Sequence, residues 1–393
     1  MIHRLFKPLI SQSFFIFGPR GSGKSTYLKH QFFTDFADQT AHQINLLDYQ
    51  FLDRYASSLQ LLNSDLLALT KKPDWIIIDE IQKVPALLDQ IHMMIEDHQF
   101  KFILTGSSAR KLKRGSANLL AGRAYDYKLH PLTFFEVENL LTLNEILNWG
   151  SLPKTLSLDE PSRKEYLRSY TQTYLKEEIL EELLVRNGVA FRNFLKIAGH
   201  ENGNSLSFNK LSKDLNLDRK TVENYFQILQ DTLVGFFVPA FHRSTRKSIK
   251  QQPKFYIFDL GVKKALTDEL DSVYVSRTAA YGKAFEHFLI CEIFRLNTYY
   301  RADFDLHHYQ TTAGGEIDLV LTKGRKTIAI EIKSSEKIDL TEVHKLKKTS
   351  QDISADEVYY VSNDSISSQH ENVTCLHWKN FLRKLFNQTK DVL

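Results

Sequence analysis

Apolar runs alternate with amphipathic stretches along the first third of the chain. Residues 14–17 and 75–78 are uninterrupted apolar runs, as expected of strands that are buried on both faces of a sheet. We expect strands within residues 14–17, 45–48, 75–80 and 101–108, and helices within residues 59–67 and 87–95. This alternation predicts a parallel, doubly wound α/β sheet that binds its ligands at the carboxyl ends of the strands.

The pattern changes twice further along the chain. Residues 161–184 have the periodicity of helices, and another compact unit follows a polar loop near residue 200. From about residue 279, a long helix precedes a hairpin and a last helix over residues 340–348. We therefore divide the chain into three parts, which are residues 1–135, 136–275 and 276–393.

Charge and cysteine content narrow the class of protein. The net charge of +4 over 393 residues does not by itself identify a nucleic-acid-binding protein. Basic residues gather within 110–123 and 243–264, where they either contact phosphates or form solvated faces. Cys291 and Cys375 are isolated in the sequence, so they indicate neither a disulfide framework nor a zinc site. Without a long apolar run or a cleavable signal, the chain is expected to be cytoplasmic, with no membrane partner.

The first expected strand runs directly into a phosphate-binding loop of the form G-x-x-x-x-G-K-S. Its glycines allow the backbone to approach an anion closely, and its N–H groups and the following helix N-terminus attract phosphate oxygens. We expect Lys24 to reach the β- and γ-phosphates of ATP and Ser25 to bind Mg²⁺. The expected nucleotide-binding residues are Gly18, Pro19, Arg20, Gly21, Ser22, Gly23, Lys24, Ser25 and Thr26.

An acid pair follows the second long apolar run. Asp79 and Glu80 stand at the end of an expected buried strand, where Asp79 can hold Mg²⁺ and Glu80 can act as the general base for the attacking water. Acid pairs at strand ends also occur as ordinary caps, but the preceding phosphate loop favours the catalytic interpretation.

Two further polar positions extend this site. Ser107 follows the next expected strand, where its hydroxyl either contacts the γ-phosphate and the water or caps a helix. Arg123 either reaches the phosphate of a neighbouring subunit or is a plain surface arginine.

Residues 207–226 have the form of a helix-turn-helix. A first helix is expected to end near Leu215, and Asp218 is placed to cap the second. Val222, Phe226 and Leu229 are expected to face the core. The outward positions are Arg219, Lys220, Thr221, Asn224 and Tyr225, whose side chains suit phosphates and base edges. With strands near 235–240 and 254–258 this segment predicts a winged helix, which either contacts DNA or serves as a protein-binding module or lid.

The last part of the chain carries acidic residues and a lysine at a suggestive spacing. Glu331 and Lys333 lie two apart in an expected strand and therefore share one face, while Asp318 lies on the partner strand of the hairpin. Glu286 on the preceding helix adds a third carboxylate. In this order the residues resemble the PD-(D/E)xK nuclease superfamily, which implies Mg²⁺ ligands at Glu286, Asp318 and Glu331, with Glu331 and Lys333 catalytic. Domains of that fold also serve only to bind nucleic acid or a partner.

Five motifs in order resemble one protein family. They are the phosphate loop, WIIIDEIQKVP (75–85), LTGSSA (104–109), LAGR (120–123) and HPLTFFE (130–136). This set is similar to the prokaryotic AAA-type ATPases that carry a DUF4143 region. The resemblance implies an AAA+ core, a winged-helix segment and a C-terminal restriction-endonuclease-like α/β domain.

The sequence thus predicts an ATP- and Mg²⁺-dependent AAA+ ATPase that acts on DNA in repair, recombination or defence. If Arg123 reaches the phosphate of a neighbouring subunit, several copies of the chain must assemble, so a homo-oligomer such as a hexameric ring is expected. The alternative is an ATP-gated signalling or assembly switch, whose C-terminal domain binds a protein partner and cleaves no DNA.

Overall fold

The computed structural model describes residues 2–107, 112, 120, 122–175, 188–242, 251–311 and 314–387. Most of the two basic clusters predicted from the sequence, together with Ser108, lies outside these residues. No helix among the described residues is both long and apolar enough to cross a membrane.

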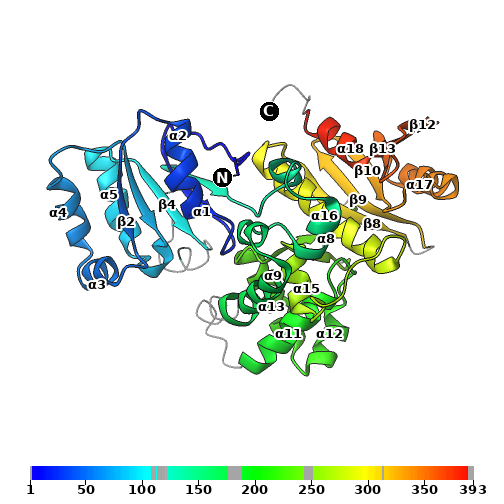
Figure 1. Cartoon of the computed structure of the whole chain (residues 1–393), viewed down its shortest axis with the longest axis horizontal. Helices are drawn as coiled ribbons and strands as arrows, with labels where there is room; N and C mark the ends of the chain where they lie inside the picture. Colours follow the sequence, from blue (N-terminus) through cyan, green and yellow to red (C-terminus); the bar gives the residue numbers. More distant parts are fainter. Residues whose placement is uncertain are drawn as a thin grey trace.

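A five-stranded parallel sheet forms the N-terminal part (Figure 1). Its strand order is β2-β3-β4-β1-β5. The strands are β1 (Ser13–Phe17), β2 (Ala41–Asn45), β3 (Trp75–Asp79), β4 (Phe102–Gly106) and β5 (Ala124–Lys128). The predicted α/β sheet is therefore confirmed. The strand expected within 45–48 is wrong in position, because it ends at Asn45 and Asp48 instead caps the next helix.

Helices cover both faces of this sheet, since alternate strand residues enter two separate apolar clusters. Phe15, Phe17 and Ile76 belong to one cluster, whereas Phe14 and Ile16 belong to the other. The connecting helices are α1 (Lys24–Thr26), the π-helix η1 (Tyr27–Phe32), α2 (Phe33–Asp35), α3 (Tyr49–Ser57), α4 (Gln60–Leu67), the 3₁₀ helix η2 (Ile81–Lys83) and α5 (Leu87–His98).

The middle part is mostly helical and lies between the two sheets and below them in the view of Figure 1. Its elements are α8 (Leu143–Trp149), η3 (Pro153–Ser157), α9 (Glu160–Ser169), η4 (Tyr170–Leu175), α11 (Gly188–His200), α12 (Phe208–Leu215), α13 (Arg219–Asp231), β6 (Gly235–Val238), β7 (Lys254–Ile257) and α15 (Leu260–Leu266). The first helix of the predicted helix-turn-helix ends at Leu215, and Asp218 caps the second, both as predicted.

Helix α13 also corrects one prediction. Val222 and Phe226 are fully buried, as expected from the apolar spacing. Tyr225 was expected to face outward, but its ring packs against Phe191 and Phe194 of α11. The expectation is wrong because α11 covers this side of the helix as well.

The C-terminal part contains a mixed six-stranded sheet of order β12-β13-β11-β10-β9-β8. The strands are β8 (Asp305–Gln310), β9 (Glu316–Lys323), β10 (Lys326–Ile332), β11 (Glu357–Ser362), β12 (Ser368–His370) and β13 (Val373–His377), with helices α16 (Ala279–Tyr299), α17 (Leu340–Asp352) and α18 (Trp378–Leu385). Helix α7 (Phe134–Val137) and α8 contribute side chains to the same core as α16 and this sheet. The polypeptide that leaves the first sheet therefore packs directly onto the C-terminal part.

Candidate functional site

The phosphate loop follows β1 and curls around its own lysine. Gly21 and Gly23 have φ values of 77° and 95°, a region that favours glycine, so the spacing of glycines in the motif matches the backbone that the loop adopts. Lys24 is buried, and its Nζ donates to the carbonyl oxygens of Gly18 at 2.8 Å and Pro19 at 3.4 Å. The structure thus places a buried ammonium group at the floor of the loop.

A chain of hydrogen bonds joins the loop to the ends of β3 and β4. Ser25 Oγ donates to Asp79 Oδ2 at 2.9 Å, and Thr105 Oγ1 donates to Asp79 Oδ1. The Thr105 hydroxyl also accepts from the backbone N–H of Glu80 at 3.2 Å. Ser25 and Asp79, which were predicted separately as magnesium ligands, are therefore brought together, with a serine hydroxyl and carboxylate oxygens that suit this ion.

Glu80 takes an unusual backbone conformation beside Asp79. Its φ of 61° is rare for a residue with a side chain and turns the chain sharply at the end of β3. Gln82 Nε2 donates to the Glu80 carboxylate and also to Ser107 Oγ at 3.2 Å. Gln82 thus links Glu80, the predicted general base, to Ser107, whose hydroxyl is predicted either to contact the γ-phosphate or to cap a helix. Sequence reasoning missed this glutamine, although its place two residues after the acid pair could have signalled it.

The loop opens onto two adjoining cavities. One has a volume of about 450 Å³ and is lined by loop residues, by Glu80 and by the η3 segment, including Lys154. The second, of about 420 Å³, is largely apolar and is lined by Tyr27, Leu140, Leu141 and Leu156 among others. Gly23, Thr26, Pro153 and Ser157 line both. A polar chamber at the loop therefore continues into an apolar one, a combination typical of small-molecule sites.

Arg4 ties the loop to the rest of the molecule. This buried side chain donates from Nη1 to the carbonyl of Ser22 at 2.7 Å and from Nη2 to the carbonyl of His130 at 2.6 Å, and its Nε pairs with Glu136 at 3.0 Å. Its Nη2 also donates to the hydroxyl of Tyr299, at the end of α16, at 3.1 Å. From the middle part, Tyr170 donates to the carbonyl of Arg20 at 2.9 Å. The phosphate loop is thus bonded to the first and middle parts of the chain directly, and to the C-terminal part through Arg4.

Arg123 lies apart from this assembly. It pairs with Glu96 of α5 and is partly exposed, and it is not among the residues that line the loop cavity of its own chain. The structure therefore does not join Arg123 to the other predicted catalytic residues within one chain.

The acidic side chains of the C-terminal part contact two lysines, Lys333 and Lys254. Lys333 pairs with Glu331 and lies 3.8 Å from Asp318 Oδ2, which also accepts the N–H of Ile332 at 2.8 Å. Glu286 Oε1 accepts from the Tyr256 hydroxyl at 2.8 Å and lies 3.6 Å from Lys254 Nζ. Burial raises the pKa of Asp318 well above its usual range, and the nearby Glu331 and Glu286 raise it further.

The predicted C-terminal magnesium site stays a prediction. Within the part of the chain that the structure describes, no group of three or more His, Cys, Asp and Glu side chains is arranged to hold a metal ion. The topology does bring Glu286, Asp318, Glu331 and Lys333 to one region, as the sequence spacing predicted. The sequence placed Lys254 in a basic cluster at the start of an expected strand, but its contact with Glu286 was not predicted.

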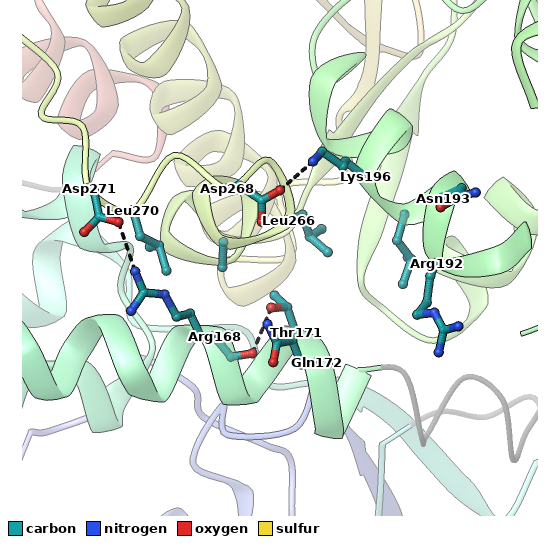
Figure 2. Close-up of a pocket in the computed structure, with 12 residues that line it drawn as sticks. Arg168, Thr171, Gln172, Arg192, Asn193, Lys196, Leu266, Asp268, Leu270 and Asp271 are labelled. Carbon is teal, nitrogen blue, oxygen red and sulfur yellow. Dashed lines mark hydrogen bonds and ion pairs between the residues drawn. The ribbon is translucent and has the colours of Figure 1, made fainter. Parts of the chain in front are cut away.

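A further cavity of about 650 Å³ lies in the middle part, between α9, α11 and α15 (Figure 2). Figure 2 shows that two of its cations turn toward acids, because Arg168 pairs with Asp271 and Lys196 pairs with Asp268. This cavity therefore presents less positive charge than its arginines and lysine suggest, and we do not place the nucleotide there.

Comparison with known families divides the chain in a similar way. Residues 11–138 match the model of an AAA domain, and residues 281–381 match a domain of unknown function, DUF4143. Residues 140–272 match another domain of unknown function, DUF8612. The AAA and DUF4143 matches confirm the family resemblance predicted from the sequence motifs.

Individual relatives are distant. An uncharacterized protein of Haemophilus influenzae is 21% identical over 67% of this chain and 71% of its own length. One of Methanocaldococcus jannaschii is 27% identical over 62% of this chain and 60% of its own length. Among solved structures, the replication initiator DnaA bound to AMPPCP and single-stranded DNA has a TM-score of 0.31 and 16% identity, over 56% of this chain and 83% of that one. AMPPCP-bound DnaA from Aquifex aeolicus has a TM-score of 0.28 and 13% identity, over 62% and 86%.

Proposed function

We propose, from the matches to an AAA domain and to DUF4143, that the chain binds and hydrolyses ATP at the phosphate loop. The observation that carries the proposal is the hydrogen bond between Ser25 and Asp79, which joins the loop to the acid pair beside a cavity lined by Lys24 and Glu80. The triphosphate occupies the polar cavity, and the base and ribose extend into the apolar cavity beside Tyr27.

Each group then has a role in phosphoryl transfer to water. Lys24 neutralises charge on the β- and γ-phosphates, while Ser25 and Asp79 hold Mg²⁺, which supplies further positive charge to the phosphate oxygens. Glu80, held by Gln82, accepts a proton from water as the water oxygen bonds to the γ-phosphorus and the bond to the β–γ bridging oxygen breaks. The products are ADP and inorganic phosphate.

Removal of the metal tests this assignment in the unmodified protein. We expect phosphate release from ATP to require Mg²⁺, to stop when EDTA is added and to resume when Mg²⁺ is restored in excess. Phosphate release that continues at an unchanged rate in EDTA would contradict the roles of Ser25 and Asp79.

We further propose that the ATPase acts on DNA through α13. The support is a set of exposed polar side chains at its N-terminal end, chiefly Lys220 and Asn224, which suit contacts to phosphates and base edges. Arg219 is also exposed there, but it pairs with Glu223 at 2.7 Å. Because Arg123 does not line the cavity of its own chain, its proposed role at a phosphate requires a second copy.

Duplex DNA tests the second proposal. We expect DNA to raise the rate of ATP hydrolysis, and Lys220→Ala to weaken DNA binding and to reduce the slope of log K against log salt by about 1. Lys71→Ala, an exposed lysine on the first part of the chain, is the matched control and should leave both unchanged. A rate of ATP hydrolysis that does not change when DNA is added at low salt would instead favour the ATP-gated switch. The pairing of the C-terminal carboxylates with lysines also suits that role.

A further inference from the structure

The C-terminal carboxylate cluster receives a lysine from the middle part of the chain. Lys254 is the first residue of β7, and only 5% of it is exposed. Its Nζ lies 3.0 Å from Glu316 Oε1 on β9 and 3.6 Å from Glu286 Oε1 on α16. One ammonium group therefore joins three segments that are far apart in the sequence.

The surroundings of Lys254 favour its charged form. The carboxylates of Glu286 and Glu316 lie 3.6 and 3.0 Å from its Nζ, and opposite charges at such distances stabilise the ammonium form. Tyr256, two residues along β7 and on the same face, donates to the Glu286 oxygen that faces Lys254. β7 thus presents both a cation and a hydrogen-bond donor to Glu286.

The remaining acids leave one oxygen unsatisfied. Glu331 is only 7% exposed and uses Oε1 to pair with Lys333, while its buried Oε2 has no hydrogen-bond partner among the residues that the structure describes. A buried carboxylate oxygen without a donor is unfavourable. The cluster therefore retains a ligand atom suited to a cation while its other acids are occupied by ammonium groups.

We propose that Lys254 is the resident cation of this cluster and takes the place of a divalent metal ion. Glu286 is engaged by Lys254 and Tyr256, and the cluster binds no divalent ion. Glu286, Asp318 and Glu331 are not arranged as a metal-binding group in this structure, but without the Lys254 ammonium their oxygens would lack this cation and would attract a divalent ion such as Mn²⁺.

The test measures binding of Mn²⁺ to the full-length, nucleotide-free protein, using the electron paramagnetic resonance signal of unbound Mn²⁺. Lys254→Gln should gain a Mn²⁺ site, and adding Asp318→Asn to that variant should remove it. Lys254→Arg, which keeps the charge, should resemble the wild type. A folded Lys254→Gln protein that binds no more Mn²⁺ than the wild type would overturn the proposal.

Two measurements keep the proposal testable if Lys254→Gln is unstable, since removal of a buried cation leaves its carboxylates uncompensated. Mn²⁺ should raise the melting temperature of Lys254→Gln more than that of the wild type, because an ion that binds only the folded state stabilises it. The single substitution Asp318→Asn, made in a protein that keeps Lys254, should leave Mn²⁺ binding as it is in the wild type. Loss of a wild-type Mn²⁺ site in Asp318→Asn would show that the cluster binds metal despite Lys254 and would refute the proposal.

Discussion

Lys24→Ala is expected to reduce the rate of ATP hydrolysis by roughly 100-fold to 1000-fold, the range observed when one preorganised donor is removed from a catalytic site. The wild-type ammonium is buried and held within the loop by the carbonyls of Gly18 and Pro19, so its charge already lies where the phosphates are expected to bind. Removal of its charge also leaves the triphosphate less well neutralised in the ground state. Steady-state phosphate release at saturating ATP and Mg²⁺ measures the effect.

Lys29→Ala provides the matched control for this prediction. Lys29 lies in the same helical segment but is exposed, and it is not among the residues that line either nucleotide cavity. We expect its turnover to match the wild type. Equal losses in the two variants would mean that charge on this helix in general, and not Lys24 in particular, supports the activity.

Arg4→Met is expected to destabilise the protein by about 3–5 kcal/mol, the cost of breaking a buried ion pair from one side. The change leaves the Glu136 side chain buried without its cation, and it removes donors from the carbonyls of Ser22 and His130. Since Ser22 belongs to the phosphate loop, ATP should also bind more weakly. Urea denaturation followed by circular dichroism, together with ATP titration, measures both effects.

Arg54→Met is the control that tests whether the loss of stability requires a buried ion pair, because it breaks an exposed arginine–carboxylate pair. Arg54 makes two hydrogen bonds to Asp65 on an exposed surface, where solvent screens the interaction. We expect its unfolding midpoint to remain near that of the wild type. Adding Glu136→Gln to Arg4→Met should recover part of the stability, because it removes the uncompensated charge. An Arg4→Met midpoint equal to that of Arg54→Met would contradict the role assigned to the buried pair.

The sequence predicted those features that depend on neighbouring residues. The phosphate loop, the acid pair at the end of β3 and the hairpin of β9 and β10 each follow from a short pattern whose spacing determines backbone geometry or strand face. Strand β2 was misplaced because it lies at the edge of its sheet. Only Ile44 of its five residues is buried, so the apolar signal is weak.

The features that sequence reasoning missed depend on contacts between distant segments. Arg4 and Glu136 are 132 residues apart, and although Glu136 ends the HPLTFFE motif, nothing in that motif points to Arg4 as its partner. Lys254 likewise lies 62 residues from Glu316, at the start of a strand that was itself predicted. Such pairs are specified by the packing of the three parts against one another, which local periodicity does not encode. Gln82 is the exception, since it stands only two residues after Glu80.

The most direct test of the central claim is an isothermal titration of the wild type and Lys24→Ala with a non-hydrolysable ATP analogue in the presence of Mg²⁺. The account predicts saturable binding to the wild type and a loss of most of the affinity in Lys24→Ala, with Lys29→Ala unchanged. Equal affinity in the wild type and in a folded Lys24→Ala protein would contradict it, because the nucleotide would then bind somewhere other than the phosphate loop.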